Sequence, residues 1–191
     1  IEQFSIVAIG GAMANTFLLA NNYDVGKSLV EKDLIREANN IQLKAKKLNC
    51  ELILPIDVVC GKNIHDTNPV HRKINEILPE EMVLDIGDES TQLIKNKIIN
   101  SKMVLWNGPV GAFEFKPYDK ATNAIANIIK VNAKTLNINT LAGGGDTVSA
   151  IKNTHAEDGF NYISNAGGAF LEWLEGNESP GVKSLKENNL S

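Results

Sequence analysis

The stretch Leu141–Ala150, LAGGGDTVSA, places three consecutive glycines between an apolar run and a run with helical character. Glycine lets backbone N–H groups approach an anion, because no Cβ stands in the way. A helix N-terminus adds unpaired N–H donors and about half a positive charge. The stretch therefore fits two structures: a phosphate site in which Asp146 holds Mg²⁺ and Thr147 offers its hydroxyl, or a plain strand-to-helix turn with Asp146 as N-cap.

Short runs of mostly apolar residues recur along the chain, as is typical of strands buried on both faces of a sheet. They are Ser5–Gly10, Cys50–Val59, Met82–Ile86, Lys102–Trp106, Asn139–Gly143 and Phe160–Ser164. Apolar residues at three- and four-residue spacing predict helices from about Glu31, after Tyr118 and after Gly168. The alternation predicts a Rossmann-like α/β fold, with three α/β/α layers around a parallel sheet of about six strands. The segment Gly61–Pro79 shows no clear period and is predicted to be a long loop or an irregular excursion.

Glycines stand at the ends of several of these predicted strands. In an open parallel sheet, ligands bind at the carboxyl ends of the strands, so we expect these glycines to converge on one site. They are Gly10, Gly11, Gly108, Gly111, Gly143, Gly144, Gly145, Gly167 and Gly168.

Composition excludes several classes of protein. The 191 residues carry a net charge of −4, so no basic face for nucleic acid is indicated. Two cysteines suggest no disulfide framework, and no apolar run approaches the ~18 residues that span a bilayer. We expect a cytoplasmic monomer that binds neither nucleic acid nor membranes. The chain begins at Ile1, directly before a predicted strand, so we expect a fragment of something longer.

Two further patterns have simpler explanations. Val25–Ser28, VGKS, ends like a phosphate-binding Walker A loop, but that motif needs glycine where Asn21 stands. The three histidines have no catalytic partner pattern, and we expect them at the surface.

The loop WNGPVGAFE, which begins at Trp106, leaves two alternatives open. It could hydrogen-bond a ribose or base through Asn107 and Glu114, or could be an ordinary loop with an Asx turn.

Together these stretches resemble the nucleotide-binding, C-terminal domain of the phosphoglycerate kinase family. The resemblance rests on motifs found in order over nearly the whole chain: IGGAMANTFL, VGKSLVEKD, LPIDVV, DIG, WNGPVGAFE, AGGGDTVSA, SNAGGAFLEWLEG and PGVKSL. It implies reversible phosphoryl transfer between ATP and 3-phosphoglycerate with Mg²⁺. It also implies a nucleotide-binding domain over residues 1–176 and a tail over residues 177–191 that packs on another domain.

The resemblance also implies roles for individual residues. Gly10 and Gly11 would line the adenine side, Asn107 and Pro109 would flank the nucleotide, and Glu114 would hold its ribose. The phosphates would lie on Gly144, Gly145, Asp146 and Thr147, with Asp146 on the metal. Gly167 and Gly168 would aim N–H groups at the phosphoryl group in transfer, as catalytic residues. Such assignments suit the reaction, because phosphoryl transfer depends on positioning and charge neutralisation.

Two departures from the family pattern affect this interpretation. Ala166 and Asn165 stand where the family has a glycine and a threonine, so an added Cβ lies at an otherwise bare turn. The family's first strand, with its glycine-alanine-lysine segment, and its 3-phosphoglycerate-binding N-terminal domain would both precede Ile1. We therefore expect weak nucleotide binding and no turnover from this chain alone. The alternative is a stand-alone Rossmann-type nucleotide-binding module. A dinucleotide-binding module would carry G-x-G-x-x-G after its first strand, and this chain has GGAMAN there, which argues against it.

Overall fold

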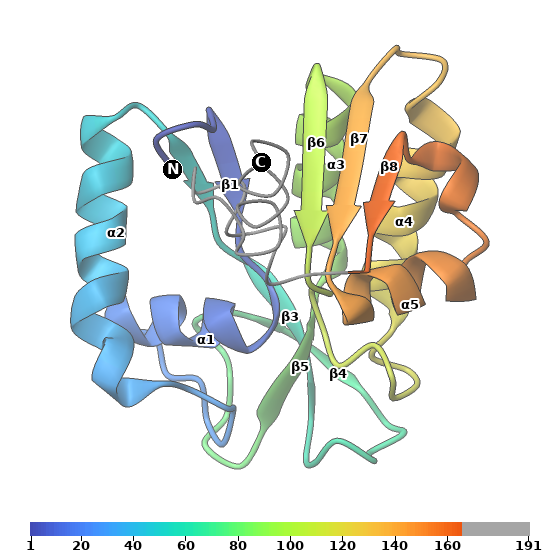
Figure 1. Ribbon diagram of the computed structural model, residues 1–191. Coiled ribbons are helices and arrows are strands. Elements are labelled where there is room, and N and C mark those ends of the chain that lie inside the picture. The colour runs from blue at the N-terminus through green and yellow to red at the C-terminus, as the bar shows by residue number, and fades with distance from the viewer. Residues whose placement is uncertain (166–191) are drawn as a thin grey trace, which may run out of the picture.

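The computed structural model describes residues 1–165, in which strands and helices alternate along the chain (Figure 1). The strands are β1 (Ile6–Ala8), β2 (Glu51–Ile53), β3 (Asp57–Gly61), β4 (Val70–Lys73), β5 (Met82–Ile86), β6 (Met103–Asn107), β7 (Asn139–Gly143) and β8 (Tyr162–Ser164). The α-helices are α1 (Gly11–Ala20), α2 (Ile35–Lys47), α3 (Asp88–Ile99), α4 (Lys120–Asn132) and α5 (Gly145–Asn153). Short 3₁₀ turns cover Lys32–Leu34 and Glu157–Gly159.

The strands form three sheets within residues 1–165. β1 pairs with β2 in parallel, and β6, β7 and β8 form a second parallel sheet with β7 at its centre. β3 lies between β4 and β5 in an antiparallel sheet. The α/β, Rossmann-like class is thus confirmed, but the parallel strands described number five in two sheets rather than about six in one.

Three details of the predicted strands are wrong. Cys50–Val59 is not one strand, because Pro55 has no N–H to donate and separates β2 from β3. Met82–Ile86 runs antiparallel to β3 and so lies outside the parallel sheets. The predicted loop Gly61–Pro79 contains β4, which pairs with β3 through residues with little apolar alternation.

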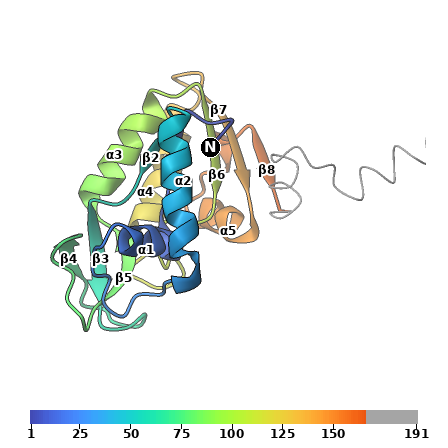
Figure 2. The same ribbon diagram turned by 90° about the vertical axis from the view of Figure 1, so that its left-hand side faces the viewer.

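Within residues 1–165, helices pack on both faces of β1–β2 and on one face of β6–β8. Side chains of α1 and α2, including Phe17 and Ala38, form one cluster with residues of β1 and β2. A larger cluster joins α3, α4 and α5 to β6 and β7, and α3 and α4 lie behind β6–β8 in Figure 1. Figures 1 and 2 both place the antiparallel sheet at the end of the molecule toward which β6 runs.

The predicted helices are confirmed where the structure describes them. In α2 the apolar stripe is buried at Ala38 and Ala45, whereas Leu34 and Leu48 at its two ends stay exposed. In α4, Ala121, Ile125 and Ile129 all enter the larger cluster. The helix predicted after Gly168 lies outside the described residues. None of the helices within residues 1–165 has the length and hydropathy that a membrane-spanning helix needs.

We predict that Ile129→Ala lowers the free energy of unfolding by about 2–4 kcal/mol, because it leaves a cavity in the larger cluster. Ile129 is 1% exposed, whereas Val131 on the same helix is 69% exposed. Val131→Ala is therefore the matched control and should change the free energy by less than about 0.5 kcal/mol. Urea unfolding of both variants measures the difference; equal effects would contradict this account of the core.

Candidate functional site

The loops that follow β1 and β6 meet at the carboxyl ends of these strands. The N–H of Gly11 donates a hydrogen bond to the carbonyl oxygen of Val110 (2.9 Å). A Cβ built on Gly10 would lie only 2.7 Å from the Cβ of Val110, so this approach requires glycine at position 10. The first two predicted glycines therefore contact the WNGPVGAFE loop directly.

The same loop contacts the glycine run after β7. Asn107 pairs with Gly143 in the sheet, and the N–H of Gly108 donates to the hydroxyl oxygen of Thr147 (2.6 Å). Gly144 has φ +97°, a conformation that L side chains rarely adopt, and a Cβ there would lie 3.0 Å from Asn107 Oδ1. β8 ends at the same place, since Gly143 pairs with Ser164.

Among residues 1–165, no side chain caps the N-terminus of α5, which is called the open helix end below. Its N-cap is Gly144, with no side-chain hydrogen bond, and the helix begins at Gly145. Asp146 lies exposed in the first turn, so the alternative in which Asp146 is the N-cap is wrong. Thr147 is fully buried, and its hydroxyl oxygen accepts the hydrogen bond from the N–H of Gly108.

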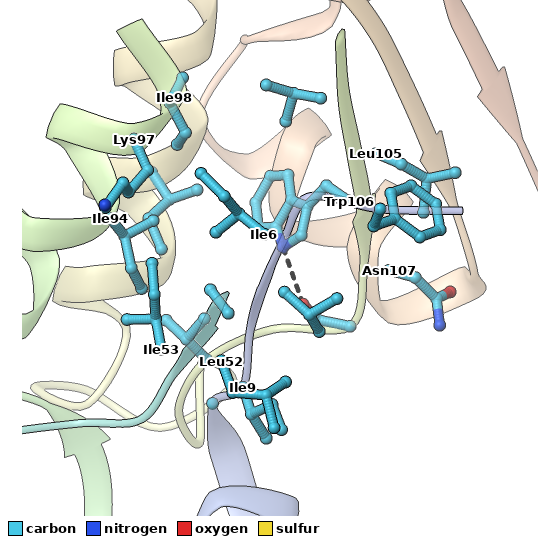
Figure 3. Close-up of a pocket in the computed structure, with 18 of the residues that line it drawn as sticks. Ile6, Ile9, Leu52, Ile53, Ile94, Lys97, Ile98, Leu105, Trp106 and Asn107 are labelled. Atoms are coloured by element: carbon cyan, nitrogen blue, oxygen red, sulfur yellow. Dashed lines mark hydrogen bonds between the residues drawn. The ribbon is translucent and has the colours of Figure 1, made fainter. Parts of the chain in front are cut away.

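A cavity of about 730 Å³ opens between β1 and β6 (Figure 3). One end of it is lined by predicted site residues, namely Gly10, Gly11, Asn107 and Pro109, together with Gly108. The rest of its lining is almost entirely apolar. The strand ends and this cavity therefore form one continuous candidate site.

Other predicted residues lie apart from that cavity. Glu114 is exposed in the loop between β6 and α4 and is not among the residues that line the cavity. Gly111 approaches β5 rather than the strand-end cluster. Gly167 and Gly168, like Ala166, lie outside the described residues.

Trp106 orients the loop that carries Asn107 and Pro109. Its indole N–H donates to the carbonyl oxygen of Gly108 (2.8 Å), the bond drawn as a dashed line in Figure 3. Its ring stacks on Phe160 with centroids 6.1 Å apart. Trp106 is buried in the larger cluster, and this hydrogen bond gives it a second part in the site.

Asp85 is a residue that the sequence did not single out. It is 2% exposed; its Oδ2 accepts from the N–H of Ala121 (3.0 Å), and its Oδ1 from the N–H of Ile86 (2.9 Å). A Cβ on Gly111 would overlap the Asp85 carboxylate. Burial raises the pKa of Asp85 to about 7, against the lowering effect of these two N–H groups. Asp85 thus joins β5, the β6 loop and α4.

The remaining sequence patterns have structural explanations. Val25–Ser28 precedes no α-helix directly, and Ser28 accepts from the N–H of Val83 (2.8 Å), so it is not a Walker A loop. All three histidines are exposed, as predicted, and both cysteines are buried and free. Among the described residues, no group of three or more His, Cys, Asp or Glu side chains could hold a metal.

Comparison with known proteins shows the family of this chain. The model of one sequence family, Phosphoglycerate kinase, matches residues 1–177. The chain belongs to the phosphoglycerate kinase family. The phosphoglycerate kinase of Xanthobacter flavus is 44% identical over 188 residues, which are 97% of this chain and 47% of that protein. That of Granulibacter bethesdensis is 45% identical over 185 residues, which are 96% and 47% of the two chains.

A solved structure agrees. The phosphoglycerate kinase from Coxiella burnetii matches 98% of this chain and 47% of its own, with 32% identity and a TM-score of 0.91. This chain therefore spans about half the length of the phosphoglycerate kinases that it matches. The strand-end motifs quoted above lie within the matched family region, up to residue 177.

We predict that Asp85 lowers the free energy of unfolding as the pH rises from about 4 to about 7. The pKa of Asp85 is about 7 in the folded chain against 3.8 in the unfolded one, so the folded state binds the extra proton in this interval. Above pH 7 the carboxyl is ionised in both states, so Asp85 causes no further change in stability. Asp85→Asn should reduce the loss between pH 5 and pH 8 by on the order of 2 kcal/mol.

Urea unfolding at the two pH values measures this difference. Asp33→Asn, which changes an exposed carboxylate, is the control and should leave the pH dependence as it is. An Asp85→Asn chain with the same pH dependence as the natural sequence would show that the carboxyl is ionised in the folded state.

Proposed function

We propose that this chain is the nucleotide-binding half of a phosphoglycerate kinase, which transfers a phosphoryl group reversibly between ATP and 3-phosphoglycerate. The observation that carries the proposal is the convergence of the ends of β1, β6 and β7. Gly11 contacts Val110, and Gly108 contacts Thr147, so the three glycine turns form one connected surface. Ligands of open parallel sheets bind at such an edge.

The adenosine part of the nucleotide is assigned to the apolar end of this surface. Gly10 and Gly11 form its adenine side, and Asn107 and Pro109 flank the nucleotide, since all four line the same cavity. Glu114 is exposed on the same loop, and we assign it to the ribose hydroxyls. Because it does not line the cavity, this contact would form only when the nucleotide binds. The bare glycine backbone leaves room for a planar ring to lie against it.

The phosphates are assigned to the open N-terminus of α5. Gly145, Asp146 and Thr147 present backbone N–H groups there, and Gly144, whose own N–H donates to the carbonyl oxygen of Ser164 (3.2 Å), leaves the turn without a side chain. The partial positive charge of the helix end attracts the phosphate oxygens. The hydroxyl of Thr147 holds the β6 loop in place, which keeps the adenine and phosphate parts of the site in register.

The residues at this turn fit a Mg²⁺ ion that is held largely by the nucleotide. Asp146 is exposed beside the open helix end, and the described residues contain no group of three or more His, Cys, Asp or Glu side chains that could hold the ion without the nucleotide. Mg²⁺ commonly takes one or two carboxylates together with phosphate oxygens and water. The ion would neutralise charge on the phosphates, while Asp146 would orient it.

The other half of the chemistry is assigned to parts of the protein beyond residues 1–165. Lys97 is the one charged side chain among the described residues that line the cavity, and it pairs with Glu51. The described lining of the cavity thus offers no unpaired cation to a phosphate group. We propose that Gly167 and Gly168 act on the transferring group. Residues 1–176 would form the nucleotide-binding domain, with 177–191 as its tail. The second substrate, 3-phosphoglycerate, would bind to another domain.

We predict that the chain binds MgADP and not NADH, which separates a kinase half from a dinucleotide-binding module. Asp146→Asn should weaken MgADP binding about tenfold, because one charge-assisted contact to the metal is lost, and should weaken metal-free ADP binding much less. Calorimetry at millimolar nucleotide measures both. Asp158→Asn, which alters another exposed carboxylate, is the control. Binding of NADH in preference to MgADP would reject the proposal.

We also predict no turnover from the chain alone. A coupled assay that follows ATP consumption in the presence of 3-phosphoglycerate should give no rate above background, because the acceptor site is assigned elsewhere. Steady turnover by the 191-residue chain would show that it also binds 3-phosphoglycerate, and would contradict the assignment of that substrate to another domain.

A further inference from the structure

The peptide bond between Asn107 and Gly108 lies in the middle of the surface that the glycine turns form. It belongs to the only Asn-Gly pair in the sequence. Asn107 is exposed, and a Cβ built on Gly144 would lie 3.0 Å from its Oδ1. In Figure 3 the side-chain amide of Asn107 points away from Ile6 and Ile94 on the apolar side of the cavity. The amide therefore lies beside the turn that starts α5.

An asparagine followed by glycine can react with its own backbone. The glycine nitrogen gives up its proton and bonds to the asparagine Cγ, while the side-chain nitrogen leaves as ammonia and takes that proton. The product is a succinimide ring, and water then breaks one of the two ring C–N bonds that involve the glycine nitrogen. Opening at Cγ gives aspartate, and opening at the backbone carbonyl gives isoaspartate. The reaction consumes only water.

The surroundings of Gly108 leave room for this ring. A Cβ built on Gly108 would meet no atom within 4 Å, and the residue has φ +92°, a conformation that side chains rarely adopt. Since glycine has no Cβ, its nitrogen can approach the Asn107 amide without a steric obstacle. Space therefore does not prevent the reaction at this peptide bond.

Two hydrogen bonds restrain the reacting peptide instead. The N–H of Gly108 donates to the hydroxyl oxygen of Thr147 (2.6 Å), so the nitrogen holds the proton that it must lose. The carbonyl oxygen of Gly108 accepts from the indole N–H of Trp106 (2.8 Å), which limits rotation of the glycine. Thr147 is fully buried, so water does not compete for its hydroxyl. Attack on Cγ thus requires the bond to Thr147 to break.

The product would place a charge where the phosphates are assigned. Deamidation replaces a neutral amide by a carboxylate beside Gly144, the N-cap of α5. The partial positive charge of the open helix end would then face a covalently attached anion, which repels a phosphate group and competes for the same backbone donors. Asp146 already places one carboxylate in this first turn.

We propose that Asn107 is a site of spontaneous deamidation, that the hydroxyl of Thr147 restrains the reaction, and that the product closes the open helix end to phosphate groups. The chemical step depends only on the Asn-Gly pair and the bond from Gly108 to Thr147. Its effect on nucleotides rests on the proposed function. Two experiments keep these two parts apart.

The first experiment measures the rate of deamidation. The folded chain is incubated in mildly alkaline buffer, and peptide mapping by mass spectrometry follows aspartate and isoaspartate at position 107. Thr147→Val removes the acceptor of the Gly108 N–H and should raise the rate about tenfold, the equivalent of one hydrogen bond. Thr147→Ser keeps a hydroxyl and should stay close to the natural chain. The chain unfolded in urea should react at least as fast as Thr147→Val.

Ile129→Ala controls for general loss of stability, because Ile129 lies in the larger cluster and makes no contact with the reacting peptide's hydrogen bonds. It should leave the rate at Asn107 nearly unchanged. The proposal is overturned if Thr147→Val reacts no faster than the natural chain, or if Ile129→Ala accelerates the reaction equally. It is also overturned if no folded chain forms aspartate or isoaspartate at this position.

The second experiment measures the effect of the product on nucleotides. Asn107→Asp carries the charge of the deamidated chain and should weaken MgADP binding about tenfold in calorimetry. Asn107→Gln, which keeps a neutral amide, should weaken it less. Asn100→Asp is the matched control, since it makes the same change at an exposed residue that ends α3, and should have no effect.

Equal MgADP binding by Asn107→Asp and the natural chain would contradict the closing of the helix end. Failure of the natural chain itself to bind MgADP would reject the proposed function, while the deamidation rates would still decide whether Thr147 restrains Asn107.

Discussion

The hydrogen bond from the N–H of Gly11 to the carbonyl oxygen of Val110 is the contact on which the site depends. Within residues 1–165 the two parallel sheets share no strand pairing, so this bond and the close approach of Gly10 to Val110 fix one strand end against the other. The bond from Gly108 to Thr147 then extends the connection to α5. The open helix end and the cavity are thereby held at a defined spacing, as a nucleotide with adenine at one end and phosphates at the other would require.

The sequence predicted the parts of this arrangement that have local causes. Glycine runs after apolar runs indicated where strands end, and Gly10, Asn107 and Gly144 do meet at one edge. Helical spacing located α2 and α4, because their buried faces repeat at three and four residues. The family resemblance, carried by the same motifs, is borne out by the comparisons.

Long-range partners were beyond sequence reasoning. β4 has an alternation too weak to show that it would pair with β3. α3 is capped by Asp57, whose carboxylate accepts from the N–H groups of Glu89 and Ser90, more than thirty positions along the chain. Asp85 lies in a short apolar run, and only the fold shows that its carboxylate supports Ala121 and the β6 loop. A single acidic residue carries no local sign of such partners.

The central claim is that three glycine turns act as one nucleotide surface. Heteronuclear NMR of the chain during titration with MgADP tests it most directly, because each turn has its own backbone amide signals. The account predicts that the amides of Gly11, Gly108 and Gly145 shift together along a single binding curve. Shifts confined to one turn, or separate curves for the three, would contradict it.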